Sequence, residues 1–336
     1  MENLKKQNII EYCKTFLMVH GIGVELEDEK LVLHRGKNIG CYTSTVVETE
    51  PFNLLVGSFA GYSDDDATIE LEVRVRVDDV WSKFFTYGEW GMGRDNYYYD
   101  QDDAVAKMSV DEIFIKDGKQ ANALQYKITL KKTKQLSPKV SLVAFTMIGE
   151  GEKETKEYPE LPKEVNYDVP CLNQNIVPEI GNQICSPTTI TMLLMHRGFD
   201  FSDKDPEFPH RYIAKMVADP GHNSPTYGNW VYNTAVAGAL GLNAYVARFD
   251  DWNELKYHLA TVGPVGASIK GDTGVYKTGG HLLVVRGYKE TDKGTFVLCN
   301  DPNINDRFGE GLFVYYEYPL ETFMNFWRGV AYIIEK

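Results

Sequence analysis

The stretch NQICSPTTITMLLMHRG, residues 182–198, decides how the C-terminal half of the chain folds. Pro187 suits the first turn of a helix, where a backbone N–H would have no partner in any case, and Gly198 suits the position after the last turn. The residues between them are mostly apolar or tolerant of a helix, so the stretch predicts a helix near 186–197. Cys185 then lies at the N-terminus of that helix.

That position suits a reactive cysteine. The partial positive charge at a helix N-terminus stabilises a thiolate, and the thiolate is the nucleophilic form of cysteine. The alternative is that Cys185 is a small buried residue that packs the helix start, as free cysteines often do. A basic partner elsewhere in the chain is needed to decide between the two.

A second stretch, TGGHLLVVRGYKETDKGTFVLCNDPN at 278–303, has two apolar runs separated by a polar turn and predicts a β-hairpin. If the hairpin closes symmetrically about Thr291, residue 281 lies opposite residue 301, since paired positions of antiparallel strands sum to a constant. His281 and Asp301 are then neighbours, and the carboxylate would fix the tautomer of the imidazole. A half-buried histidine and an Asp-Pro turn are the alternatives. A slip of one residue would put Asn300 in the place of Asp301.

The first half of the chain has a different pattern. Residues 1–20 carry apolar residues at helical spacing, which predicts a short N-terminal helix. From 21 to 148 the segments are short, and TIELEVRVRV at 68–77 alternates apolar with charged residues, as a strand with one buried face does. Many short strands with turns between them indicate an antiparallel β-sandwich.

Residues 149–164 are charged, contain two prolines and are poor in apolar residues, so we expect a linker there. From 165 to 336 we expect helices near 186–197, 208–218, 229–240 and 251–261, and strands at 264–269, 281–288, 295–300 and 312–317. The predicted fold class is therefore α+β, with a β-sandwich domain at 21–148 ahead of a second domain at 165–336.

Composition limits the partners and the setting. The chain carries a net charge of −13 without a basic stripe, which argues against nucleic acid. Every apolar run is shorter than the ~18 residues that a membrane span needs, and we recognise no export signal. The five cysteines have no spacing typical of a disulfide framework or a zinc site. We expect a cytoplasmic protein with no cofactor and no metal.

An ordered set of motifs resembles a known family. DVPCLNQ (168–174), CSPTT (185–189), GGHLLVV (279–285) and NDP (300–302) are similar to motifs of bacterial cysteine peptidases related to the bacteriocin double-glycine leader peptidases, a branch of the papain-like superfamily. The stretches at 218–230, 263–269 and 326–334 add to this resemblance, which covers about 169–336. A fainter likeness over roughly 50–148 is to the strand-rich region that precedes some of these peptidase domains.

The resemblance implies a papain-like fold for 165–336 and a role for several residues. Cys185 would be the nucleophile, His281 the base and Asp301 the residue that orients the base. The family also uses a glutamine upstream of the nucleophile, whose amide joins the backbone N–H of the cysteine in an oxyanion hole. The VPxxxQ pattern assigns this role to Gln174, and Gln183 competes for it because the loop from Gln174 to Cys185 is long for the family.

The function implied is hydrolysis of a peptide or isopeptide bond through an acyl-enzyme on Cys185. A non-catalytic binding module on the same fold is one alternative, and an amidase or acyltransferase using the same residues is another. Trp230 would line the substrate groove or anchor its helix. The aromatic residues Trp81, Trp90 and the tyrosines at 97–99 would offer a surface to a carbohydrate or peptide ligand, or would pack inside the protein.

Overall fold

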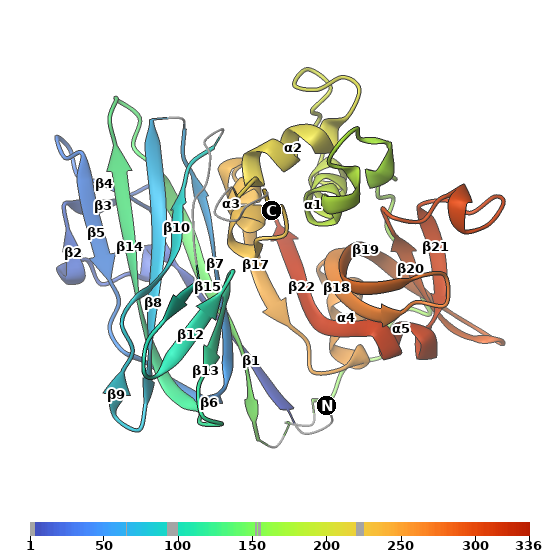
Figure 1. Ribbon diagram of the computed structural model, residues 1–336, viewed down its shortest axis with the longest axis horizontal. Helices are drawn as coiled ribbons and strands as arrows, with labels where there is room; N and C mark the ends of the chain where they lie inside the picture. Colours follow the sequence, from blue (N-terminus) through green and yellow to red (C-terminus); the bar gives the residue numbers. More distant parts are fainter. Residues whose placement is uncertain (1–3, 65, 93–99, 152, 154–155, 220–224) are drawn as a thin grey trace. The chain divides into compact units, whose positions relative to one another are not determined.

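The computed structural model describes residues 4–64, 66–92, 100–151, 153, 156–219 and 225–336 (Figure 1). Strands dominate the described residues, and five α-helices accompany them, so the fold is α+β. The chain divides into two compact units, Met1–Glu154 with Met216–Arg248 and Thr155–Lys215 with Phe249–Lys336. None of the described helices has both the length and the apolar character that crossing a membrane requires. The tyrosines at 97–99 lie outside the described residues.

The first unit contains two antiparallel sheets. One has the strand order β11-β12-β13-β7-β15-β4-β3, with β1 paired to β15, and the other has the order β10-β8-β14-β5-β2, with β6 beside β14 and β9 beside β8. The strands are β1 (Leu4–Tyr12), β2 (Gly21–Ile22), β3 (Val24–Glu27), β4 (Lys30–Leu33), β5 (Ile39–Thr43), β6 (Val47–Phe52), β7 (Leu54–Tyr62), β8 (Ala67–Val77), β9 (Val80–Trp81), β10 (Phe85–Trp90), β11 (Gln101–Asp102), β12 (Ala106–Ser109), β13 (Glu112–Ile115), β14 (Ala121–Lys132) and β15 (Lys139–Glu150).

The alternation in β8 gives the strand one buried face, as the sequence predicts. Its apolar residues are buried, whereas the charged residues between them are partly exposed. Glu72 of β8 lies opposite Lys127 of β14, and the two side chains form an ion pair on the outer face. On the inner face, the ring of Tyr126 from β14 lies 5.1 Å from that of Phe145 from β15. Aromatic residues from the two sheets therefore share one core.

Residues 4–12 form strand β1, so the prediction of an N-terminal helix is wrong there. β1 pairs with β15 along its whole length. The side chain of Asn8 adds to this pairing, because its Oδ1 accepts from the Thr146 hydroxyl (2.6 Å) and the Arg248 N–H (2.8 Å), and its Nδ2 donates to the Arg248 carbonyl (2.8 Å). A short helix is marginal by itself, and a ready strand partner outweighs helical spacing.

Helix α3 (Trp230–Ala239) and strand β17 (Asn243–Arg248) belong to the first unit, where they pack on β7 and β15. Gly238 permits the close approach of α3, since a Cβ there would come within 2.2 Å of the backbone nitrogen of Gly61. The compact units therefore interrupt the domain expected at 165–336. In addition, β15 extends to Glu150, so the first residues of the expected linker belong to a strand.

The two tryptophans expected on the surface of the first unit are covered. Trp90 is fully buried, and its ring packs edge-on against Phe59 at 6.2 Å. The guanidinium groups of Arg74 and Arg76 lie over the ring of Trp81, at 4.6 and 5.7 Å from its centroid. Exposure of Trp90 is thus contradicted, because it occupies an inward-facing position of β10.

In the second unit, strands β22, β18, β19, β20 and β21 form one sheet in that order, with β16 beside β19. Helix α1 packs on β18 and β19 (Figure 1). The elements are β16 (Glu164–Asn166), α1 (Cys185–His196), α2 (Pro209–Val217), α4 (Trp252–Thr261), β18 (Val265–Asp272), β19 (Lys277–Thr291), β20 (Gly294–Asn300), β21 (Tyr315–Pro319), α5 (Leu320–Phe326) and β22 (Trp327–Glu335). The four predicted helices are α1 to α4, and α5 and β22 were not predicted.

Candidate active site

Cys185 is the first residue of α1 and is partly exposed to solvent. The other end of the helix closes as the sequence predicts, since Gly198 has a φ of +97°. Its N–H bonds to the carbonyl of Met195, and the N–H of Phe199 bonds to that of Leu194, which together make a Schellman cap. The helix is therefore defined at both ends, and its N-terminal turn presents the thiol.

The first turns of α1 are fixed on the sheet. The hydroxyl of Ser186 lies 2.8 Å from that of Tyr332 on β22, and both are buried. Gly266 of β18 lets the helix approach closely, because a Cβ there would come within 2.8 Å of the side chain of Thr189. The contacts of Ser186 with β22 and of Thr189 with β18 thus determine where Cys185 lies.

The hairpin of β19 and β20 is confirmed, but its predicted register is wrong. Thr291 pairs with Gly294, so the turn is centred one and a half residues further along than expected. A bulge between Val285 and Gly287 then shifts the pairing again, and Val284 lies opposite Asn300. Gly287 has room only for a hydrogen, because a Cβ there would meet the carbonyl oxygen of a residue of β16 at 1.9 Å. Residue 281 is therefore not directly opposite residue 301.

His281 and Asp301 are nevertheless in contact. Nε2 of His281 lies 2.9 Å from Oδ1 of Asp301, and the two side chains are 6% and 0% exposed. Asp301 follows the end of β20, where its N–H bonds to the carbonyl of Val314. The amide of Asn300 instead donates to the carbonyls of Val169 and Pro170, so Asn300 does not take the place of Asp301.

The thiol of Cys185 and the imidazole of His281 lie close enough for each to shift the pKa of the other. Burial alone would raise the pKa of Cys185, but the hydrogen bond and charge of His281, with backbone hydrogen bonds at Leu282 and Ser186, lower it below its ordinary value. Burial would likewise lower the pKa of His281, but the charge of Asp301 and the hydrogen bonds to Asp301 and Cys185 raise it to about 10. Both directions favour a thiolate beside an imidazolium.

Asp301 has further partners that the sequence analysis missed. Its Oδ2 accepts hydrogen bonds from the hydroxyls of Tyr276 (2.7 Å) and Tyr318 (3.0 Å), and its Oδ1 also accepts from the N–H of Asn303 (3.0 Å). Burial would raise the pKa of Asp301, but the charge and hydrogen bond of His281, with the hydrogen bonds from Tyr276 and the Asn303 N–H, lower it. Neither tyrosine lies in a motif, and only the pairing of β20 with β21 brings Tyr318 close.

The two candidate glutamines differ in burial. Gln174 is 3% exposed at the start of the 3₁₀ turn Gln174–Ile176, whereas Gln183 is exposed. The Nε2 group of Gln174 donates to the carbonyl of Gly181 (2.8 Å), and its backbone N–H donates to the carbonyl of Pro302 (2.9 Å). These bonds tie Gln174 to the loop that leads to Cys185 and to the residue after Asp301. Within the described residues, the Oε1 atom of Gln174 is buried without a hydrogen-bond partner.

The remaining predicted residues lie in other surroundings. Trp230 is a residue of the first unit, is 9% exposed, and donates its backbone N–H to the carboxylate of Asp111. Its expected contact with substrate stays a prediction. Cys299 is fully buried, and Cys171 is half-buried with a pKa raised mainly by burial.

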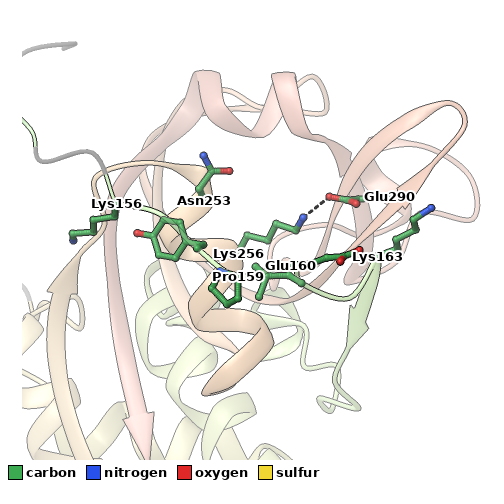
Figure 2. Close-up of a pocket in the computed structure, with 9 residues that line it drawn as sticks. Lys156, Pro159, Glu160, Lys163, Asn253, Lys256 and Glu290 are labelled. Carbon is green, nitrogen blue, oxygen red and sulfur yellow. Dashed lines mark hydrogen bonds and ion pairs between the residues drawn. The ribbon is translucent and has the colours of Figure 1, made fainter.

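A pocket of about 430 Å³ in the second unit involves none of the predicted site residues (Figure 2). Three of its lining residues are lysines, but two of these already pair with carboxylates. Lys156 forms an ion pair with Glu254 at 2.6 Å, and Lys256 forms one with Glu290 at 2.5 Å. Lys163 is exposed at its rim. We assign this pocket no chemistry.

Comparison with known families follows the two halves of the chain. Residues 24–147 match the family model described as the Peptidase C39 N-terminal domain, and residues 166–333 match the one described as the Peptidase_C39 like family. No curated protein matches the chain closely enough to count as a relative. The second match spans half of the chain, includes the residues from Gln174 to Asp301 discussed above, and confirms the resemblance in the motifs. The chain therefore belongs to the Peptidase_C39 like family.

Proposed function

We propose that the protein is a cysteine peptidase that hydrolyses peptide or isopeptide bonds with Cys185 as nucleophile, His281 as base and acid, and Asp301 as the residue that orients His281. The observation that carries this proposal is the 2.9 Å contact of His281 with the buried Asp301 carboxylate, next to a Cys185 thiol whose pKa His281 lowers. Because Nε2 of His281 is engaged by Asp301, the other ring nitrogen, Nδ1, is the one that serves Cys185.

The proposed reaction has two steps. The thiolate of Cys185 attacks the carbonyl carbon of the amide, the C–S bond forms, and the C–N bond breaks as His281 gives its proton to the leaving amine. Water then loses a proton to His281 and attacks the thioester, which releases the acid and restores the thiol. The helix N-terminus and the protonated imidazole both favour the thiolate that starts the cycle.

Gln174 is the proposed side-chain donor of the oxyanion hole, together with the backbone N–H of Cys185. Its burial and its tethers to Gly181 and Pro302 support it over the exposed Gln183. A donor held in place before the substrate arrives costs no reorganisation during the reaction.

We also propose that the second unit has a papain-like fold and that the two sheets of the first unit form a β-sandwich, with the linker beginning after β15 ends at Glu150. The helix that carries Cys185 and the sheet that carries His281 support the first, and the aromatic core shared by the two sheets supports the second. The substrate is a peptide or protein, as the family name implies.

The test of the nucleophile is alkylation by iodoacetamide as a function of pH, with the modified cysteine identified by mass spectrometry. We expect Cys185 to react well below pH 8 and ahead of the other four cysteines, and we expect His281→Ala to abolish this selectivity. His196→Ala is the matched control, because His196 lies at the other end of α1 and bonds to the Asp168 carbonyl. Equal reactivity of all five cysteines would favour a non-catalytic binding module.

A second experiment tests the reaction itself. The protein is incubated with a mixed peptide library, and the products are identified by mass spectrometry, with Cys185→Ala as the blank. New carboxyl and amino termini that need Cys185 support a peptidase. The incubation is repeated with an added amine. Products in which the new carboxyl end is joined to that amine, instead of being a free acid, would assign acyl transfer to the same residues.

A further inference from the structure

Two tyrosines converge on the carboxylate oxygen of Asp301 that His281 leaves free. The hydroxyls of Tyr276 and Tyr318 lie 2.7 and 3.0 Å from Oδ2, while Oδ1 faces His281. The tyrosines come from different parts of the second unit, since Tyr276 follows β18 and Tyr318 is on β21. A carboxylate is an acceptor only, so both hydroxyls must donate to it when it is ionised.

Packing fixes both rings independently of Asp301. The ring of Tyr276 lies edge-on to the imidazole of His281 (centroids 5.8 Å apart) and stacks on Phe308 at 5.2 Å. The ring of Tyr318 is 1% exposed and packs against Phe326 at 5.0 Å. Since the rings are held by other side chains, their hydroxyls form a rigid pair of donors at Oδ2.

We propose that Tyr276 and Tyr318 are positioning residues of the active site, which keep Asp301 ionised and turned so that Oδ1 faces His281. The proposal rests on the function proposed above and deepens it by adding two groups that touch neither substrate nor the reacting sulfur. Asp301 is fully buried, so without these donors its ionised form would lack the hydrogen bonds that water supplies at a surface.

The ionisable groups that face Asp301 define what a pH profile would report. They are His281 on β19, the two tyrosines, and at longer range Cys299 on β20, while Cys185 on α1 acts on His281 and Tyr276. Burial raises the pKa of both phenols, and the charge and hydrogen bond of Asp301 raise it further, so both hydroxyls stay protonated across the working range. The hydrogen bond from Tyr276 in turn lowers the pKa of Asp301. Loss of a hydroxyl raises the pKa of Asp301. The carboxylate then protonates at a higher pH, and His281 loses its counter-charge there.

The experiment compares Tyr276→Phe and Tyr318→Phe with the wild type in the pH dependence of Cys185 alkylation by iodoacetamide, which needs no peptide substrate. We expect the acidic limb of each profile to move to higher pH, and the rate on that limb to fall about tenfold per hydroxyl, since a hydrogen bond to a charged group is lost. Tyr288→Phe is the matched control, because Tyr288 is another buried tyrosine of the same unit and its hydroxyl donates to the carbonyl of Pro162.

A variant that preserves packing guards against misfolding. Incorporation of 3-fluorotyrosine at position 276 keeps the ring and makes the phenol a stronger donor, so the acidic limb should move to lower pH. The proposal is overturned if the acidic limb of the alkylation profile stays in place in Tyr276→Phe, in Tyr318→Phe and in the 3-fluorotyrosine variant. It is also overturned if the limb moves by the same amount in Tyr288→Phe. A wild-type Cys185 with the reactivity of an ordinary thiol would instead overturn the proposed function, which separates the two failures.

Discussion

Gln174 shows how a buried side chain can be held ready for a bond that it does not yet make. Its Nε2 group has two N–H bonds, and the carbonyl of Gly181 accepts one of them. The other is the donor that we assign to the oxyanion hole. Gln183 is exposed in the 3₁₀ turn Gly181–Gln183.

The pair therefore gives a direct comparison. We predict that Gln174→Ala lowers kcat roughly 10²–10³-fold, the usual effect of losing one oxyanion donor, while Cys185 alkylation stays close to that of the wild type. Gln183→Ala should leave kcat unchanged. The measurement is steady-state cleavage of a peptide selected from the library experiment, and a reversed order of the two variants would assign the role to Gln183.

For single residues, the sequence predicts the place of a residue within its own helix or strand better than it predicts which distant residues that residue contacts. Cys185 begins a helix because Pro187 and Gly198 mark the two ends of that helix locally, and no strand in the described part of the chain competes as a partner for the segment. The proximity of His281 and Asp301 was predicted from a hairpin register that is wrong, and they meet because Asp301 lies beyond the end of β20. Tyr276 reaches Asp301 because of the conformation of the turn between β18 and β19. The spacing of apolar and polar residues does not predict the conformation of such a turn.

Among the elements, the contact of α1 with β18 governs the position of the thiol. Gly266 has no positive φ, so the need for glycine there is purely one of space between the helix and Tyr332. A Cβ at Gly266 would meet the Thr189 side chain at 2.8 Å and that of Tyr332 at 3.2 Å.

We predict that Gly266→Ala lowers the free energy of unfolding by about 1–3 kcal/mol, as overpacking does, and slows Cys185 alkylation by displacing α1. The stability control is Gly279→Ala, since a Cβ at Gly279 meets nothing within 4 Å. Urea unfolding followed by fluorescence measures both. Equal stability of the two variants would mean that the helix shifts without cost.

Strand β1 depends on Asn8 and yields a second prediction. Asn8→Ala removes three hydrogen bonds with Thr146 and Arg248, and we expect it to lower the free energy of unfolding by about 1–3 kcal/mol. Gln7 is adjacent but makes an exposed hydrogen bond to the Glu50 carbonyl, so Gln7→Ala should change stability by less than about 0.5 kcal/mol. Chemical denaturation of both variants is the test. Similar losses of unfolding free energy in the two variants would mean that backbone pairing with β15, and not the Asn8 side chain, holds β1 in place.

The elements that the sequence predicted share one property. Strand β8 carries its pattern in the alternation of its own residues, and helix α1 carries its pattern in Pro187 of its first turn and the glycine cap at its end. Residues 4–12 had a helical pattern but became a strand, because β15 offered a partner that is distant in sequence. Long-range pairing is the information that a single sequence does not display.

Over the molecule as a whole, one buried carboxyl couples stability to pH. Asp111 of the first unit is 4% exposed, and burial raises its pKa to about 8 from an ordinary value of 3.8. Between these two pH values the folded chain retains a proton that the unfolded chain has released. Stability therefore falls as pH rises through this window.

We predict that Asp111→Asn flattens the decline of Tm between pH 4 and pH 8, since asparagine keeps an oxygen for the Trp230 N–H but has no proton to lose. Asp117→Asn is the control, because it makes the same substitution at an exposed position. Differential scanning calorimetry at several pH values makes the comparison. An unchanged slope in Asp111→Asn would place the pH dependence elsewhere.

The membership of α3 and β17 in the first unit has a consequence for biosynthesis. Translation delivers residues 1–154 first, but the surfaces of β7 and β15 that α3 and β17 pack against wait for residues up to Arg248. A nascent chain at that stage exposes an apolar surface, which is the situation in which chaperones act and in which fragments aggregate. An expression vector that stops at the linker should therefore give inclusion bodies, and one that supplies Met216–Arg248 as a fused segment should restore a folded product.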